Sequence, residues 1–243
     1  MKLNGKQYDK FILNGKTYEK FYLNNKIYQS LDPGLILDLP LQNNFTDYSA
    51  SGISMVAANA NGFPSFVSDG SGGYALDFGG TKGIKTSINF PINTRDAVTV
   101  VLDIRTTQTT TGAIINLATD YSINNAFAFW INYLASNKIT SADHKGSSFN
   151  LGNSITNVNS GAWINVAMVI DRSLGINQNK IYINKVLSFM QNGSFYTDIN
   201  GVFGLYPLVL GLFSTGTSNA YVGQIRNVKI FNYPLSAGEI TAL

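Results

Sequence analysis

The chain contains no cysteine, which excludes disulfide bonds and metal sites built on thiolates. Charged residues make up only 13% of it, about half of the usual share for a soluble protein. No apolar run is long enough to span a membrane, since the longest, 202–213, is broken by Gly204, Pro207 and Gly211. The first residues show no apolar stretch of the secretory-signal type. We therefore expect no membrane insertion, and either synthesis and folding in a cytosol or a secretory signal that has been removed.

Carboxylates and imidazoles are too scattered to suggest a catalytic centre. Glu19 and Glu239 are the only glutamates and lie near opposite ends of the chain. Asp103 and Asp171 fall in separate expected strands, and the only histidine, His144, falls in an expected loop without a nucleophile motif nearby. Acid–base catalysis needs titratable groups positioned together at the reacting atoms. The sequence therefore favours a protein without enzymatic activity.

Neutral polar residues and 23 glycines take the place of the missing charge, which favours many short strands and turns. The net charge of +3 is unevenly spread: residues 1–30 hold six lysines against two acidic residues, and the remainder holds eleven basic against twelve acidic residues. The nearly neutral body does not resemble a nucleic-acid binder. The basic segment is more simply a solvated face, so we expect no nucleic-acid partner.

The N-terminal segment is a ten-residue repeat, LNGKQYDKFI (3–12), LNGKTYEKFY (13–22) and LNNKIYQSLD (23–32). Asn-Gly is a strong signal for a two-residue hairpin turn, so each unit predicts one short strand and one tight turn. Such strands are marginal alone and need a partner surface for their apolar anchors. Those anchors are Tyr8, Phe11, Tyr18, Phe21, Tyr28 and Leu31. Residues 1–32 are therefore either a small meander packed on its own domain or an arm for attachment and oligomerisation.

A turn at 32–34 is the expected boundary, and 35–243 the expected main domain. Strands are expected at 35–41, 98–105, 127–133, 163–171, 179–187 and 222–233, because these runs are rich in β-branched and aromatic residues. Trp163 opens one of them and is expected in the core. Ser236 and Glu239 have the spacing of a capping box, which predicts a short C-terminal helix.

Three motifs resemble those of laminin-G-like and concanavalin-A-like jelly rolls. The ending G-x-I-x-x-V-x-I-F-N-x-x-L-S-x-x-E-I-x-x-L runs from Gly223 to Leu243, the loop N-x-x-D-x-S-x-x-G from Asn44 to Gly52, and W-x-x-V-A-x-x-x-D from Trp163 to Asp171. The resemblance implies an all-β fold, a two-sheet antiparallel sandwich of the jelly-roll type, with the repeat as a short β arm. It also implies a role in binding more than in catalysis. Related glucanases carry an E-x-D-x-x-E strand that this chain lacks.

The resemblance also suggests ligands. Domains of this kind often bind calcium, for which Asp69 and Asp77, or Asp47 with Asp38, are candidate ligands; no cofactor is otherwise expected. For a glycan, an aromatic ring beside an amide on the solvent face of the strand 127–133 would form a sugar platform. Trp130 and Asn132 share that face, and His144 is a candidate neighbour. Alternatively, Trp130 is itself part of the core.

Together, these features favour a non-enzymatic structural and adhesion protein of a bacteriophage virion, such as a head or tail fibre or a decoration subunit. Repeats of this kind resemble the attachment segments of phage fibre and appendage proteins. The expected partners are other copies of the chain, with a trimer by analogy with fibres, other virion proteins, and a surface polysaccharide. A cellular carbohydrate-binding or adhesion module, outside the cell or on its surface, is the alternative, and a glycoside hydrolase is less favoured.

Overall fold

The structure is a computed structural model of the 243-residue chain. It describes residues 34–90, 97–117, 126–145, 148–174, 176, 178–191, 206–213 and 219–243, and the backbone of four strands within 1–33. The side chains of 126, 144, 145 and 148–150 are outside the description. No helix in these described parts is long and apolar enough to cross a membrane.

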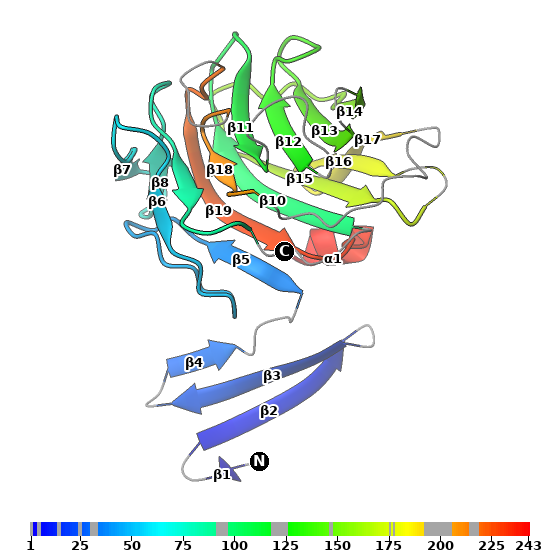
Figure 1. Ribbon diagram of the computed structural model, residues 1–243. Coiled ribbons are helices and arrows are strands. Elements are labelled where there is room, and N and C mark those ends of the chain that lie inside the picture. The colour runs from blue at the N-terminus through cyan, green and yellow to red at the C-terminus, as the bar shows by residue number, and fades with distance from the viewer. Residues whose placement is uncertain are drawn as a thin grey trace.

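Two antiparallel sheets stack face to face and form the body (Figure 1). One sheet runs in the order Val186–Met190 (β17), Asn179–Ile183 (β16), Ile164–Asp171 (β15), Ala97–Arg105 (β10), Gln224–Phe231 (β19), Tyr74–Asp77 (β8) and Ser65–Ser68 (β7), with Leu35–Leu39 (β5) also paired to β19. The other runs Ser148–Asn153 (β14), Ile139–Lys145 (β13), Ala126–Ile131 (β12), Gly112–Asn116 (β11), Val209–Leu210 (β18), Ile84–Thr86 (β9) and Met55–Ala57 (β6). The predicted all-β sandwich is confirmed.

The core lies between the sheets because alternate residues of each strand point inward. In β12, Phe127, Phe129 and Ile131 belong to the central core, whereas Ala128 and Trp130 lie on the outer face. The same alternation in the central strands adds further apolar side chains to the core, among them Val100, Leu102, Ile104, Val166, Met168 and Ile170.

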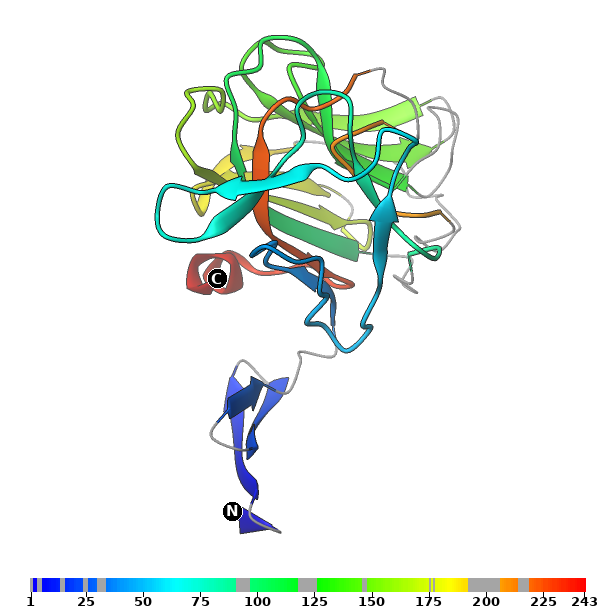
Figure 2. The same ribbon diagram turned by 90° about the vertical axis from the view of Figure 1, so that its left-hand side faces the viewer.

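The C-terminal helix α1 (Ala237–Ala242) covers part of the outer face of the eight-stranded sheet. Its N-cap, Ser236, accepts a hydrogen bond from the Glu239 N–H, and the Glu239 carboxylate accepts one from the Ser236 N–H, so the predicted capping box is confirmed. Ile240 and Leu235 pack on Tyr182 and Phe231 in a second apolar cluster. Figures 1 and 2 both place α1 at the same end of the sandwich as β5.

The N-terminal repeat forms a four-stranded antiparallel meander. Its strands are Lys2–Leu3 (β1), Lys6–Leu13 (β2), Lys16–Leu23 (β3) and Lys26–Gln29 (β4), and in the described part of the chain they pair only with one another. The intervening Asn-Gly and Asn-Asn turns and Leu31 are outside the described residues, as are the side chains of all the predicted anchors. The arm's role and the boundary at 32–34 therefore stay predictions.

A hollow beside Phe45 as the candidate functional site

The loop that resembles N-x-x-D-x-S-x-x-G is built around one half-buried carboxylate. Both oxygens of Asp47 accept two hydrogen bonds: Oδ1 from the N–H groups of Asp38 (2.9 Å) and Ser49 (2.8 Å), and Oδ2 from the Ser49 hydroxyl (2.9 Å) and the Ile53 N–H (2.7 Å). Gly52 has a φ of 55°, a left-handed conformation that glycine adopts without a steric penalty. The motif therefore fixes the loop between β5 and β6 in one shape.

The fixed loop borders a hollow of about 440 Å³. Its lining residues are Phe45, Thr46, Asp47, Gly52, Ile53, Ser54 and Met55. Ile53 and Met55 are buried and give the hollow an apolar base, whereas Thr46 and Ser54 are exposed at its rim. Neither the Thr46 nor the Ser54 hydroxyl has a hydrogen-bond partner among the residues that the structure describes. The volume is within the usual range for sites that hold small ligands.

Phe45 forms the aromatic side of the hollow. Its ring centroid lies 4.9 Å from that of Phe63 and 4.9 Å from that of Phe66, and the residue is half-buried against the central core. Phe63 remains 43% exposed. The hollow thus combines an aromatic ring held in place by its neighbours with two hydroxyls that no described residue binds, the combination that suits a ligand with one apolar face and several hydroxyl groups.

The structure does not form the sugar platform expected around Trp130. Trp130 does lie on the outer face of β12, but it is only 1% exposed because Tyr133 and Phe213 cover it, with ring centroids at 5.1 Å and 4.8 Å. Tyr206 and Leu151 complete this cluster. Trp130 therefore packs in an apolar cluster of its own, outside the central core, and its ring has no open face for stacking on a sugar.

Asn132 holds the turn that follows β12. Its amide donates to the carbonyl groups of Gln108 (2.9 Å) and Thr110 (3.1 Å), and its φ of 56° ends the strand alternation, which places Tyr133 against Trp130. His144 lies in strand β13, opposite Ala126 and Phe149, so the expected loop is wrong at 141–145, and residue 146 is outside the described part of the chain. The side chain of His144 is outside the described residues. Glycan contact by Asn132 or His144 stays a prediction.

The candidate calcium ligands Asp69 and Asp77 are not brought together, whereas Asp38 and Asp47 are adjacent, with Asp38 paired to Lys229. Asp69 and Asp77 stand at opposite ends of the β7–β8 hairpin, since Ser68 pairs with Tyr74 and Ser65 with Asp77. The Asp69 carboxylate binds the Arg226 guanidinium and accepts the N–H groups of Ser71 (2.7 Å) and Gly73 (3.0 Å). The described residues contain no group of three or more potential metal-ligating side chains of the His, Cys, Asp or Glu type. A carboxylate already paired with a guanidinium does not fit a calcium site.

Trp163 is not a core residue, so that prediction is wrong. It lies just before β15 on the outer face of the eight-stranded sheet, half-buried, while its neighbour Ile164 enters the core. The guanidinium carbons of Arg226 and Arg105 lie 4.3 Å and 5.5 Å from its ring centroid, and its Nε1–H donates to the Asp69 carbonyl (2.9 Å).

The hydrogen bond from the Ser71 N–H holds the pKa of Asp69 down to about 2, with smaller help from the Ser71 hydroxyl, the Gly73 N–H and Arg226, against the opposing effect of burial.

Asp103 and Asp171 do not form an acid–base pair. β10 and β15 pair Asp171 with Ala97 and Asn165 with Asp103, so Asp103 and Asp171 are six residues apart along the sheet. At ~3.3 Å per residue this is about 20 Å, beyond the ~5–10 Å that glycosidase carboxylates require. Asp103 also accepts hydrogen bonds from Asn165 and Asn227, both at 2.8 Å, and Glu239 is part of the capping box.

One family model, laminin G-type and described as the concanavalin A-like lectin/glucanases superfamily, matches residues 78–241, about two thirds of the chain. No curated protein sequence matches. Among solved structures, domain 4 of AbnA, a GH43 extracellular arabinanase from Geobacillus stearothermophilus in complex with arabinotriose, has a TM-score of 0.64 at 19% identity, over 86% of this chain and 97% of that one.

Two botulinum neurotoxin structures are also similar. The binding domain of neurotoxin DC in complex with SialylT has a TM-score of 0.64 at 14% identity, over 88% of this chain and 51% of the toxin chain. A structure of neurotoxin type C, whose cell entry depends on interaction with two ganglioside molecules, has a TM-score of 0.61 at 16% identity, over 86% and 50%. The chain thus spans about half of the toxin chains, and at these identities the likeness concerns the fold.

Proposed function

The chain belongs to the concanavalin A-like lectin/glucanases superfamily, and from this premise we propose that it is a non-enzymatic carbohydrate-binding protein whose sugar site is the hollow beside Phe45. One observation carries the proposal: a fixed aromatic wall and two hydroxyls without a partner in the described part of the chain, those of Thr46 and Ser54, border the same hollow. A sugar ring would place an apolar face against Phe45 and its hydroxyl groups against the rim. Apolar contact and hydrogen bonding are the two components of such recognition.

The neighbouring structures support carbohydrate as the ligand class. The arabinanase domain is in complex with arabinotriose, one toxin domain is in complex with SialylT, and cell entry of another toxin depends on two ganglioside molecules. The low charge of the chain agrees with a neutral polysaccharide more than with a nucleic acid. The absence of an enzymatic role is supported by the distance of about 20 Å between Asp103 and Asp171 along paired strands.

In this proposal the protein is a structural and adhesion component of a bacteriophage virion, made in the host cytosol. The cysteine-free composition and the repeat at residues 3–32 support it, because an arm of short strands suits attachment to other copies or to a larger virion protein. The body would then contact a polysaccharide of the host surface. Mass spectrometry of purified particles decides the location: finding the chain there supports it, and finding it on uninfected cells contradicts it.

The carbohydrate role is tested with the full chain on a glycan array that carries bacterial surface polysaccharides, arabino-oligosaccharides and sialylated glycans. Binding to at least one class, lost in the Thr46→Ala/Ser54→Ala variant, supports the hollow as the site. Absence of binding across the whole array contradicts the proposed function.

A further inference from the structure

The arm has one pairing rule throughout. In each hairpin, the pair next to the turn is a leucine opposite a lysine: Leu3 with Lys6, Leu13 with Lys16, and Leu23 with Lys26. Because the sequence repeats every ten residues, each strand meets the next in the same register. A phenylalanine therefore stands opposite a tyrosine at each full junction, Phe11 with Tyr18 and Phe21 with Tyr28. The repeat thus specifies how any strand of this type pairs with the one that follows it.

The meander has two incomplete edges. β1 pairs with β2 only at Lys6 and Gln7, so the outer edge of β2 from Tyr8 to Leu13 has no strand partner among the described residues. At the other side, β4 pairs with β3 only, which leaves its second edge without a strand partner in the same part of the chain. Strand edges of this kind present unpaired N–H and C=O groups that another strand can bind.

The two edges are complementary in their hydrogen-bonding pattern. In an antiparallel ladder, residues alternate between those that bond to one neighbour and those that face the other way, and in a two-residue hairpin the flanking pair is bonded. Leu13, Phe11 and Asp9 then face β3, and Ile12, Lys10 and Tyr8 face the open edge of β2. By the same count, Lys26 and Tyr28 face β3, and Ile27 and Gln29 face the open edge of β4.

We propose that the arms of neighbouring copies join head to tail, with β4 of one copy added to the open edge of β2 in the next. Continuing the repeat register places Tyr28 opposite Phe11, Ile27 opposite Ile12, Lys26 opposite Leu13, and Gln29 opposite Lys10. The bonded positions coincide, because Ile27 and Gln29 meet Ile12 and Lys10. The joint reproduces the tyrosine–phenylalanine pairing within the arm and brings no like charges opposite each other.

A second copy of the chain is the occupant that the repeat specifies, because only another such repeat continues the register. Every copy offers both edges, so the contact is heterologous and generates a closed ring or an open filament. The trimer expected by analogy with fibres is one such ring. The inference deepens the assembly role proposed above, whereas sugar binding by the body does not depend on it.

Charge variants of the full chain isolate the contact between copies. Gln29→Glu places a carboxylate opposite Lys20 within the arm and opposite Lys10 of the next copy. Adding the exchange Lys10→Glu/Glu19→Lys keeps every pair within the arm complementary but sets two carboxylates, at positions 29 and 10, against each other between copies. Opposite charges favour pairing and like charges oppose it, so the dissociation constant of the assembly should differ by about threefold to tenfold between the two variants.

A proline gives a stronger block. Ile12→Pro removes an N–H that faces the open edge and leaves the β2–β3 ladder intact, so the assembly should dissociate. Mass is measured by light scattering over a dilution series. A single-chain mass for the parent at all concentrations, an Ile12→Pro variant that assembles like the parent, or charge variants that shift together would each overturn the proposal. Glycan binding is measured on the same samples: a parent chain that assembles as expected but binds no glycan contradicts the sugar site alone.

Discussion

The guanidinium carbon of Arg226 lies 4.3 Å from the centroid of the Trp163 ring, on the outer face of the eight-stranded sheet. Arg226 also binds the carboxylates of Asp69 and Asp103, so one side chain links the β7–β8 turn, β10 and the residue that precedes β15. Trp163 therefore holds the β7–β8 turn against the outer face of the sheet. It does not fill the core, although it is a large apolar residue at the start of an expected strand.

Trp163→Ala should therefore destabilise the fold less than a true core truncation. Loss of the cation–π contact and of one hydrogen bond predicts a decrease of about 2 kcal/mol in the free energy of unfolding. The fully buried Phe129 is the matched comparison, and Phe129→Ala should cost about 3–5 kcal/mol. Urea unfolding of both variants checks the difference. Equal losses of unfolding free energy in the two variants would show that Trp163 stabilises the fold as much as a core residue does, and would contradict this account.

Asp69 should make the fold sensitive to acid. Its pKa in the folded protein is about 2, below the ordinary value of 3.8, so its contribution to stability is complete above pH ~4 and is lost as the pH falls towards 2. Asp69→Asn removes this titration, and its melting temperature should fall less steeply between pH 4 and pH 2 than that of the parent. Parallel slopes in thermal unfolding would show that the carboxylate contributes nothing to the acid response.

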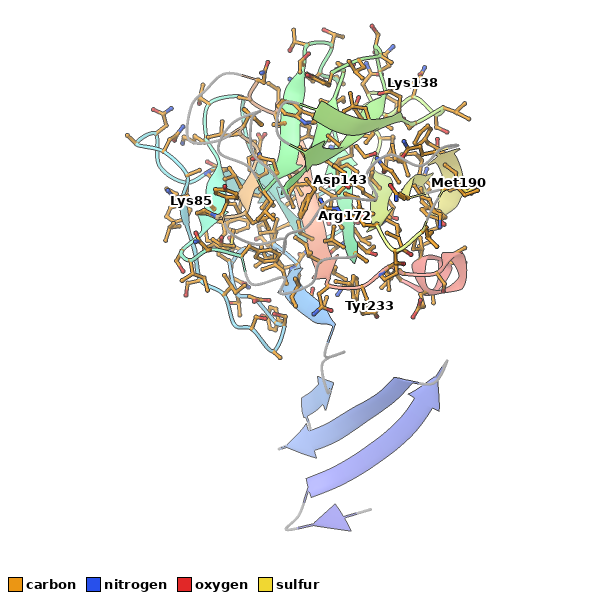
Figure 3. The ribbon with its side chains drawn as sticks, turned by 45° about the vertical axis from the view of Figure 1, so that its right-hand side comes forward. Lys85, Lys138, Asp143, Arg172, Met190 and Tyr233 are labelled. Carbon is orange, nitrogen blue, oxygen red and sulfur yellow. The ribbon has the colours of Figure 1, made fainter. Side chains whose placement is uncertain are left out.

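Asp143 and Arg172 form a buried ion pair between the sheets, with side chains 1% and 4% exposed (Figure 3). Arg172 Nε donates to Asp143 Oδ2 at 3.0 Å. Arg172→Gln breaks a buried ion pair by removing one of its two charges and should cost about 3–5 kcal/mol. The double variant Asp143→Asn/Arg172→Gln should recover part of the loss. Chemical denaturation of the two variants measures this, and a double variant that is worse than the single one would argue against the pair as the source of the cost.

Gly211 and Gly62 have similar left-handed φ values, 84° and 80°, but different surroundings. A Cβ at Gly211 would lie 1.9 Å from Cδ1 of Phe78, whereas one at Gly62 meets nothing within 4 Å. Gly62→Ala should cost about 1–2 kcal/mol from backbone strain alone. Gly211→Ala should cost at least ~3 kcal/mol, because overpacking of the core is added to the strain. Calorimetry of the two variants separates strain from overlap, and equal melting points would remove the steric part of the explanation.

Much of the fold follows from alternation in the sequence. The alternation predicts Phe127, Phe129 and Ile131 on one face of a strand, and these residues do share the core. Tyr133 leaves this pattern because Asn132 adopts a positive φ. The core prediction for Trp163 rests on its place in an apolar run, and it is wrong because this residue lies on the outer face of the sheet. Asn165, which shares its face, is the signal in the sequence that this face is outside the core.

The site is harder to predict because its parts meet only in three dimensions. The polar sequence of β13 suggests a loop, yet the segment forms a strand in which Ser141 and Asp143 face inward and bind Asn179 and Arg172. The hollow depends on Asp47, whose four hydrogen bonds fix the loop that carries Phe45. The resemblance at Asn44–Gly52 marks the loop, but not the packing of Phe45 on Phe63 and Phe66 that forms the wall.

Isothermal titration with the glycan selected from the array tests the central claim most directly. Thr46→Ala/Ser54→Ala removes both rim hydroxyls, and at about 1 kcal/mol each the dissociation constant should rise by roughly tenfold or more. Ser51→Ala/Thr107→Ala is the matched control, because these exposed hydroxyls lie outside the hollow, one of them in the same loop. The account predicts weakened binding in the first variant and unchanged binding in the second. Equal affinities of both variants and the parent would place the sugar elsewhere.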